Sequence, residues 1–592
     1  MLRGLRALLA LLLVATLPLT AAAAVDAAEA ARAHALFERA WEDSARFFPE
    51  WASFRGDHRH GDRLSDASPA GEQRFDRQVR EWLAEARSID RSRLGPQDRI
   101  SLDMFISQNQ RLVEQQAFPG LRTMTLGALG GVQSRFAELM QVVPTASKPQ
   151  VQQLLARMAA YPGHMDQQIE RLQRGIALGF VPSRDVLDRV LLQIDAQLPA
   201  QLEDTPFWRP FTRLGPDIPE AERALLQAAG RDAVEQQVLP ALRRLRAFVA
   251  GDYRAQARVD GAMLHYPDGA RIYAMQVAHS TTTRLTPRQI HDLGLRELAR
   301  LRPQMEAVLR TQGFTDDFPR FVRRLSTDPK HLAASPEALL AGYREIGKRI
   351  DGELPRLFAE LPRTPWGVRP MPAHMDAHRA EYYQGPAMDG SRAGFFFANA
   401  AAYRTRPLWA METLVAHEAV PGHHLQVARA AELRELPPFR RNAWGYTAYV
   451  EGWALYAETL GFELGLYADA PSRFGHLQSQ ALRAARLVVD TGLHAFGWSR
   501  QRCIDFMVDA TGMDRDFLAG EIDRYSSWPG QALGYMIGRL KIEELRDRAQ
   551  AKLEDRFDIR RFHNAVIDHG ALPLDTLEGL IDDWIEAQAK AP

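Results

Sequence analysis

Long amphipathic stretches limit what this chain can fold into more than any other feature of its sequence. From Ala28 onward, apolar residues recur at the spacing of a helix face, whereas strand patterns are few. The clearest stretches are residues 75–86, 148–178, 220–251 and 336–354. We expect the second of them to be interrupted at Tyr161-Pro162-Gly163, because proline removes one helical hydrogen bond. The pattern therefore predicts a mainly α fold.

Three local signals divide the helical pattern. The sequence Thr286-Pro287-Arg288-Gln289 carries a capping threonine, a first-turn proline and a glutamine three residues after the cap, so it predicts a helix start. The prolines within 362–373 predict a loop between an N-terminal helical half, about 25–365, and a C-terminal half, about 366–592. Residues 394–399, Gly-Phe-Phe-Phe-Ala-Asn, are short, aromatic and preceded by turn residues, which predicts a small strand.

Residues 1–24 have the pattern of a secretory signal peptide. Two arginines precede an apolar run from about Ala7 to Leu19, and small residues follow it. The run is shorter than the roughly 20 residues that a membrane span needs, and no cysteine near the cleavage region could carry a lipid. We therefore expect one catalytic body over residues 25–592 that is exported, periplasmic and not inserted in a membrane after signal cleavage.

Charge and cysteine content narrow the function classes. The formal net charge is zero, with 74 basic and 74 acidic side chains, so no nucleic-acid partner is indicated. The 592 residues are enough to bury a sizeable core. Because Cys503 is the only cysteine, neither an internal disulfide nor a thiolate metal cluster can form. Any bound metal must therefore be held by histidine and carboxylate side chains. The sequence carries no signal for an oligomeric state.

The segment His417-Glu418-Ala419-Val420-Pro421-Gly422-His423-His424 is the strongest candidate for a metal site. Zinc-peptidase helices usually carry His-Glu-x-x-His, which turns both imidazoles toward the metal. Here the position four residues after His417 is a proline, and His423, six residues on, lies about 240° around an unbroken helix. The Pro-Gly pair could form a bulge of two extra residues and return the next histidine to the metal face. This alignment favours His423 over His424 as the second histidine ligand, with His424 as the alternative. If His423 is the ligand, His424 would support a ligand or face the substrate.

A third ligand is predicted on the next helical stretch. Glu451 lies in an apolar and aromatic segment and is followed by Gly452, so the backbone there can pack closely. A carboxylate at this position would complete a His-His-Glu zinc site with one place left for water. Glu458, seven residues later on the same face, could hydrogen-bond a histidine ligand. A solvated helix face is the alternative for either glutamate.

Two further segments combine polar residues with helical spacing. Arg486, Asp490 and His494 form a stripe in which Asp490 could orient an imidazole and Arg486 could bind a substrate carboxylate. A set of structural salt bridges is the alternative. In the segment 526–538, glycines recur every four residues as a close-packing face, while Gln531 and Tyr535 share another face. Tyr535 could stabilise an oxyanion, with core packing as the alternative.

Together these motifs resemble a bacterial family, the domain of unknown function 885. The resemblance rests on Phe54-Arg55-Gly56-Asp57-His58-Arg59, on segments within 281–294, and on the motifs at 417–426, 451–458, 486–494 and 529–535. Members are similar to zinc peptidases with a glutamate as third ligand. The resemblance implies a helical fold with a deep cleft and a small β element beside the active-site helix, as in the thimet-oligopeptidase and carboxypeptidase Taq groups. It also implies His417, His423 and Glu451 as zinc ligands and Glu418 as general base.

The sequence thus predicts an exported zinc-dependent hydrolase that acts on peptides, as a carboxypeptidase, dipeptidase or oligopeptidase. Tyr535 and His494 would stabilise the oxyanion, and Arg486, Asn399 and Gln531 would contact the substrate. The aromatic strand at 395–399 would pair with an extended peptide along the cleft. Two alternatives stay open: a zinc amidase or esterase that acts on a small metabolite, and a non-catalytic exported binding protein with a peptidase-like fold.

Overall fold

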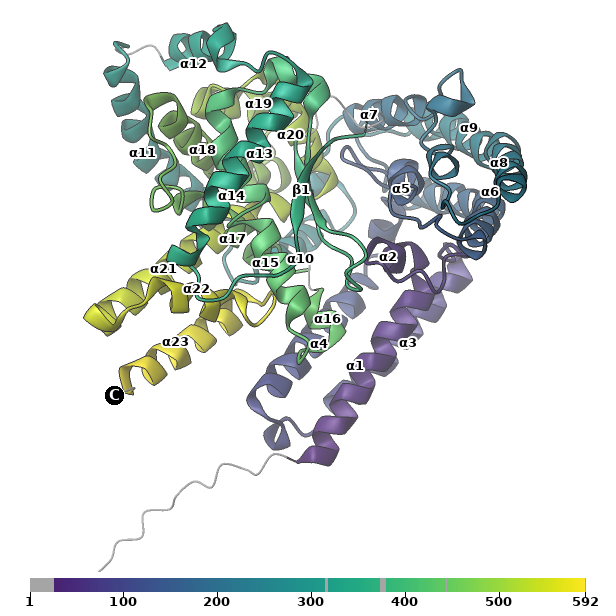
Figure 1. Cartoon of the computed structure of the whole chain (residues 1–592), viewed down its shortest axis with the longest axis horizontal. Coiled ribbons are helices and arrows are strands. Elements are labelled where there is room, and N and C mark those ends of the chain that lie inside the picture. The colour runs from purple at the N-terminus through teal and green to yellow at the C-terminus, as the bar shows by residue number, and fades with distance from the viewer. Residues whose placement is uncertain (1–25, 315–317, 373–379, 443–444, 591–592) are drawn as a thin grey trace, which may run out of the picture.

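Helices make up nearly all of the regular structure, which confirms the predicted mainly α fold (Figure 1). The computed structural model describes residues 26–314, 318–372, 380–442 and 445–590. The predicted signal peptide at 1–24 lies outside the described residues. Within them, no helix combines the length and the apolar character that a membrane crossing requires.

The described part of the chain begins with four helices, of which α1, α3 and α4 pack around a small core. Their bounds are α1 (Ala27–Phe47), α2 (Pro49–Phe54), α3 (Pro69–Arg87) and α4 (Pro96–Gln115). Asp26 caps α1 by accepting a hydrogen bond from the N–H of Ala28 at 2.8 Å. Phe37, Trp82 and Phe105 are buried between the long helices of this group.

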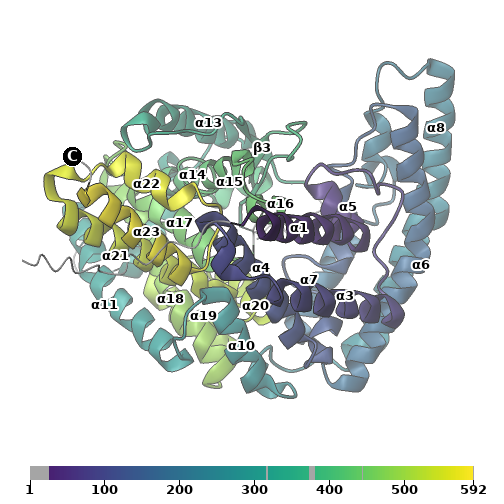
Figure 2. The same cartoon turned by 90° about the horizontal axis from the view of Figure 1, so that it is seen from below.

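The next helices form a lobe with its own core at one end of the molecule. They are α5 (Val132–Leu139), α6 (Lys148–Leu178), α7 (Arg184–Asp195), α8 (Glu220–Ala233) and α9 (Leu239–Phe248). Figure 2 shows α6 and α8 at this end and α11, α21 and α23 at the other. The predicted interruption of α6 at Pro162 is wrong, since the helix continues through it. Met158, Tyr161 and Met165 are buried on both sides of Pro162, and their burial outweighs one lost hydrogen bond.

Four helices then lead into the C-terminal part: α10 (Gly269–Thr281), α11 (Pro287–Thr311), α12 (Phe318–Thr327) and α13 (Pro336–Glu353). The predicted helix start at Thr286 is confirmed. Its side chain accepts from the N–H of Gln289 at 3.3 Å, and Gln289 Oε1 accepts from the N–H of Thr286 at 2.9 Å. This reciprocal pair caps α11.

A three-stranded sheet follows, in the order β1–β3–β2: β1 (Trp366–Pro370), β2 (Tyr382–Gln384) and β3 (Gly394–Ala398). The strand predicted at 394–399 is confirmed, but β1 forms inside the proline-rich segment that predicted a loop. β3 is the central strand, parallel to β1 and antiparallel to β2. Both of its edges are therefore occupied, and β3 cannot pair with a substrate peptide as predicted.

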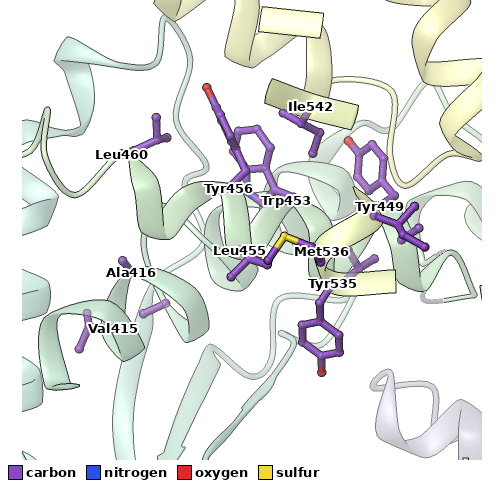
Figure 3. Close-up of a cluster of buried hydrophobic side chains, with 14 of the residues drawn as sticks. Val415, Ala416, Tyr449, Trp453, Leu455, Tyr456, Leu460, Tyr535, Met536 and Ile542 are labelled. Atoms are coloured by element: carbon purple, nitrogen blue, oxygen red, sulfur yellow. The ribbon is translucent and has the colours of Figure 1, made fainter. Parts of the chain in front are cut away.

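The remaining helices are α14 (Met411–Glu418), α15 (His423–Glu432), α16 (Pro438–Arg441), α17 (Thr447–Thr459), α18 (Ala470–Ala495), α19 (Arg500–Thr511), α20 (Arg515–Ser527), α21 (Gly534–Leu553), α22 (Ile559–Ile567) and α23 (Leu574–Lys590). Their largest core gathers Trp453, Tyr456 and Met536 with residues of α14 (Figure 3). This core extends from Met104 to Ile585, so the boundary predicted at 365 does not divide it.

Helices α17 and α21 approach each other through glycines, as the repeat of glycines in 526–538 predicted. A Cβ atom on Gly452 would lie 2.5 Å from the Cα of Gly538. A Cβ on Gly538 would lie 1.6 Å from the carbonyl oxygen of Ala448. Any side chain at either position would push the two helices apart.

We expect Gly538→Ala to lower the urea midpoint of unfolding strongly, because its Cβ meets backbone that cannot rotate away. Overpacking of this kind costs about 3 kcal/mol or more. Gly579→Ala in α23 is the matched control: no atom lies within 4 Å of its added Cβ, so we expect an unchanged or higher midpoint. Equal losses in the two variants would contradict the close contact of α17 and α21.

Candidate metal centre

A break between two helices replaces the single bulged helix that the sequence suggested. Helix α14 ends at Glu418 and α15 begins at His423, with a cis Val420–Pro421 peptide bond between them. A Cβ on Gly422 would lie 2.0 Å from the carbonyl oxygen of His417, so only glycine allows α15 to start against the end of α14. The break brings the ring centroids of His417 and His423 to 4.8 Å.

Glu451 on α17 completes a cluster with these two histidines. Its Oε2 lies 3.6 Å from Nε2 of His417 and 3.3 Å from Nε2 of His423. The three ligand atoms all lie within 4.8 Å of one another. Tetrahedral zinc with bonds of 2.0–2.1 Å separates its ligand atoms by about 3.3 Å. The residues therefore fit a zinc ion by donor type and by spacing.

Electrostatics keep the Glu451 carboxylate ionised. Burial pushes its pKa upward, but the neighbouring His423 and His417 rings hold it well below the ordinary value. Glu451 is thus ready to bind a cation at neutral pH.

Glu458 lies two helical turns after Glu451 on α17 and fixes the orientation of the His417 ring. Its Oε1 lies 2.9 Å from Nδ1 of His417, and its Oε2 accepts from the Ser479 hydroxyl at 2.8 Å. Burial raises the pKa of Glu458, but the charge of Arg483 and the bond with His417 lower it to about 2. An ionised carboxylate at Nδ1 places the ring proton there, so that Nε2 turns its lone pair to the cluster.

Glu418 follows His417 directly and is buried beside the cluster. Burial is the main cause that raises the pKa of Glu418 to about 8, and the charge of Glu451 adds to it, while His423 opposes. No hydrogen bond holds its carboxyl group within the described part of the chain. An unrestrained carboxyl group with a pKa near neutrality suits proton transfer in both directions.

Tyr535 on α21 packs against the ring of His417. The two rings stack with centroids 6.2 Å apart and planes 11° from parallel. Figure 3 shows its hydroxyl group directed away from the apolar cluster around Trp453. Burial raises the pKa of Tyr535, and the charge of Glu451 raises it further. The phenol therefore stays protonated at neutral pH and can donate a hydrogen bond.

His424 points away from the cluster, toward the sheet. Its Nδ1 lies 2.9 Å from the hydroxyl of Tyr383 on β2, and its Nε2 lies 3.1 Å from the carbonyl oxygen of Thr364. Burial lowers the pKa of His424 to about 4, so the ring is neutral. With both nitrogens bonded in this way, His424 supports the sheet, and His423 is the histidine that reaches Glu451.

Asp490 and His494 of the polar stripe lie in the packed interior instead of at the cluster. Nδ1 of His494 accepts from the N–H of Met263 at 3.0 Å, and its Nε2 lies 3.1 Å from the carbonyl oxygen of Tyr525. Both ring nitrogens are used, so His494 cannot stabilise an oxyanion as predicted. Asp490 accepts from the hydroxyl of Tyr273 at 2.6 Å and orients no ligand histidine. The structural interpretation of these two residues fits the geometry.

Arg486 packs against the ring of Tyr535. It donates to Glu521 at 2.7 Å and to the Tyr525 hydroxyl at 2.9 Å, and its guanidinium carbon lies 4.4 Å from the centre of the Tyr535 ring. Arg486 is only 5% exposed. Its bonds to Glu521 and Tyr525 fit the alternative of a structural salt bridge better than the predicted contact with a substrate carboxylate.

Gln531 and Asn399, the two other residues predicted to contact the substrate, lie in different parts of the structure. Gln531 lies beside Tyr535, as their shared helix face predicted, and its Oε1 accepts from Arg524 at 3.1 Å. Asn399 follows β3 and is buried, and its backbone N–H donates to Oε1 of Glu381 at 3.4 Å.

Sequence reasoning missed β2 and its residue Tyr383. The Tyr383 ring lies 6.4 Å from that of His423, and its hydroxyl holds His424. The aromatic pair Tyr382-Tyr383 before the turn residues Gly385-Pro386 is the signal that could have revealed a second strand.

Comparison with known proteins places the chain among proteins without a stated activity. A family model described as bacterial protein of unknown function (DUF885) matches residues 49–581. No curated protein matches. A crystal structure of a candidate lipoprotein from Colwellia psychrerythraea is similar at 26% identity and a TM-score of 0.89, covering 94% of this chain and 99% of that one.

Two further structures match less closely. A candidate lipoprotein of unknown function from Shewanella oneidensis shares the fold at 18% identity and a TM-score of 0.69, covering 94% of this chain and all of that one (100%). A candidate oligoendopeptidase F from Bacillus anthracis covers 86% of this chain and 96% of that one, but its TM-score of 0.30 at 11% identity carries no argument.

The two adjacent histidines allow a matched test of the cluster. We expect purified protein to retain one zinc ion per chain after dialysis, His423→Ala to lose it, and His424→Ala to keep it, because only His423 faces Glu451. Elemental analysis of the dialysed proteins measures the stoichiometry. Loss of zinc from His424→Ala alone would contradict the assignment.

Proposed function

The chain belongs to the bacterial family DUF885, whose description states no activity, and we propose that it is a zinc-dependent hydrolase of peptide bonds. The observation that carries the proposal is the convergence of His417, His423 and Glu451 from three helices, with Glu418 buried beside them. A purely structural zinc site is normally closed by four protein ligands. Three protein ligands beside a carboxyl group suited to proton transfer are typical of a hydrolytic centre instead.

Each residue around the cluster then has a chemical task. Zinc, when bound, supplies a Lewis acid that polarises the scissile carbonyl and acidifies water. Glu418 takes the proton of the attacking water and passes it to the leaving amine. Its pKa of about 8 in the absence of a cation favours the second of these steps, while a nearby positive charge favours the first.

Tyr535 is the proposed oxyanion donor. Its phenol remains protonated and stacks on His417, and the guanidinium group of Arg486 adds positive charge behind its ring. Charge that develops on the carbonyl oxygen would be stabilised by this hydrogen bond, which is worth most in a site shielded from water.

We also propose that the protein works outside the cytoplasm. The signal-peptide pattern at residues 1–24 supports export, and the similar Colwellia psychrerythraea structure is described as a candidate lipoprotein. The only cysteine of this chain, Cys503, is buried in α19, so a lipid on cysteine is not part of the proposal.

Glu418→Gln tests the proposed chemistry directly. We expect zinc to stay bound and hydrolysis of a mixed peptide library, followed by mass spectrometry, to fall by about 10²–10⁴-fold, because the amide cannot accept the water proton. Glu412→Gln is the control. The Glu412 carboxylate lies on the same helix but accepts a hydrogen bond from the N–H of Tyr467, so this variant should keep activity.

The same assay separates the alternatives. If the wild-type protein leaves every peptide intact but cleaves small amides or esters, the proposed substrate class is wrong, but the proposed hydrolase activity is supported. If Glu418→Gln cleaves peptides as fast as the wild type, Glu418 is not the base. If the wild-type protein retains no divalent metal, the non-catalytic alternative is favoured.

A further inference from the structure

A large cavity lies beside the candidate metal centre. Its volume is about 940 Å³, a size that suits a short peptide or another ligand of similar dimensions. One wall comes from α2, α5 and α6 of the N-terminal helices, and the other from β2, α15 and α16. Figure 1 shows the sheet and α15 on the side of the C-terminal body that faces α2 and α5.

The cavity adjoins α15 and β2, the two elements that lie next to His423. Val427 and Ala431 line it and lie four and eight residues after His423, so they continue the face of α15 that carries the candidate ligand. Tyr383 lines it too, with its ring next to that of His423. The cavity therefore lies next to the elements that carry and contact His423.

The motif at residues 54–59, which the proposed chemistry leaves unused, builds part of this wall. The N–H of Met388 donates to the carbonyl oxygen of Arg55 at 3.0 Å, and Arg392 donates to that of Phe54 at 2.7 Å. Gly56 has a φ of +91°, and a Cβ there would lie 2.8 Å from Cβ of Ala387. The motif is thus locked onto the turn after β2, and Arg55 is held at the cavity.

The cavity wall carries more positive than negative charge. Four arginines line it, namely Arg55, Arg135, Arg392 and Arg441, against two glutamates, Glu50 and Glu138. Both glutamates already accept hydrogen bonds from serine hydroxyl groups, Glu50 from Ser65 at 2.7 Å and Glu138 from Ser134 at 2.9 Å. Within the described residues, none of the four arginines forms an ion pair.

Arg55 is the clearest of these uncompensated charges. Its guanidinium carbon lies 3.4 Å from the centre of the Trp51 ring, and its Nε has no hydrogen-bond partner in the described structure. Burial alone lowers the pKa of Arg55 to about 9. Arg55 is half-buried. A partly desolvated cation without a counter-ion is costly, and an anionic ligand would reduce this cost.

We propose that this cavity binds a carboxylate group of a short peptide substrate, and that Arg55 and Arg392 receive it. The proposal rests on the proposed peptide hydrolysis and assigns its substrate class. The carboxylate is either the C-terminus of the peptide or an acidic side chain. Trp51, Phe54, Tyr382 and Trp528 give the cavity an apolar surface for the neighbouring side chains.

Calorimetry with ligands that differ by one charge tests the proposal. The protein is the full chain with Glu418→Gln, which slows consumption of the ligands. The probes are benzoyl-Gly-Phe, its C-terminal amide, and benzoyl-Asp-Phe amide, which carries its carboxylate on a side chain. We expect one or both acids to bind about 10- to 100-fold more tightly than the neutral amide. The acid that binds better identifies the source of the carboxylate.

Arginine variants locate the effect. Arg55→Gln should remove most of the preference for the acid, and Arg55→Lys should keep part of it because the charge remains. Arg369→Gln is the matched control: this arginine also stacks on an aromatic ring, 3.6 Å from the centre of Phe395, but lies outside the cavity, so the preference should persist. Circular dichroism establishes that each variant is folded.

The same ligands, measured on the His417→Ala protein, distinguish carboxylate binding by the arginines from carboxylate binding by a metal ion. If the cavity arginines receive the carboxylate, the preference for the acid survives the loss of metal. Equal affinity for acid and amide, or a preference that Arg55→Gln and Arg392→Gln both leave intact, overturns the proposal. Binding is measured without turnover, so the two proposals can fail separately. If only the proposed hydrolysis is wrong, the acids still bind as expected, but no peptide is cleaved.

Discussion

The contact of α17 with α21 through Gly452 and Gly538 is the constraint on which the rest of the centre depends. Glu451 precedes one of these glycines directly, and Tyr535 precedes the other by three residues, so a single backbone contact sets the positions of a candidate ligand and the candidate oxyanion donor. The break between α14 and α15 supplies the two histidines on the facing side. Stability and function are therefore coupled here: the residues that allow the closest helix packing are also those that place the reactive groups.

The charges around the cluster favour the binding of a cation. Glu451 and Glu458 are both ionised in the interior, and Arg483, 3.4 Å from Glu458, is the neighbouring cation. A bound dication would balance the carboxylate charge that Arg483 leaves uncompensated. The cavity next to the cluster has the opposite character, with four arginines that form no ion pair in the part of the chain that the structure describes. A peptide whose carbonyl lies at the cluster and whose carboxylate lies in the cavity would complement both regions.

Much of the fold and of the cluster could be predicted because their signals are local. Helical periodicity, the cap at Thr286 and the recurring glycines each predict what the structure shows, and the Pro421-Gly422 pair predicts that His423 meets His417. The errors concern contacts between distant segments. The partners of His494 and Arg486, Met263 and Glu521, are in other parts of the chain, so a polar stripe on one helix did not reveal which way it faces. β3 became a central strand because β1 formed within the proline-rich segment, and α6 continued through Pro162 because buried neighbours compensated for it.

X-ray absorption of the zinc-loaded protein tests the central claim most directly. The account predicts a first shell of nitrogen and oxygen atoms only, at about 2.0–2.2 Å, with the outer-shell scattering of two imidazoles from His417 and His423. A sulfur atom in the shell, the scattering of one or three imidazoles, or a protein that binds no zinc would contradict it.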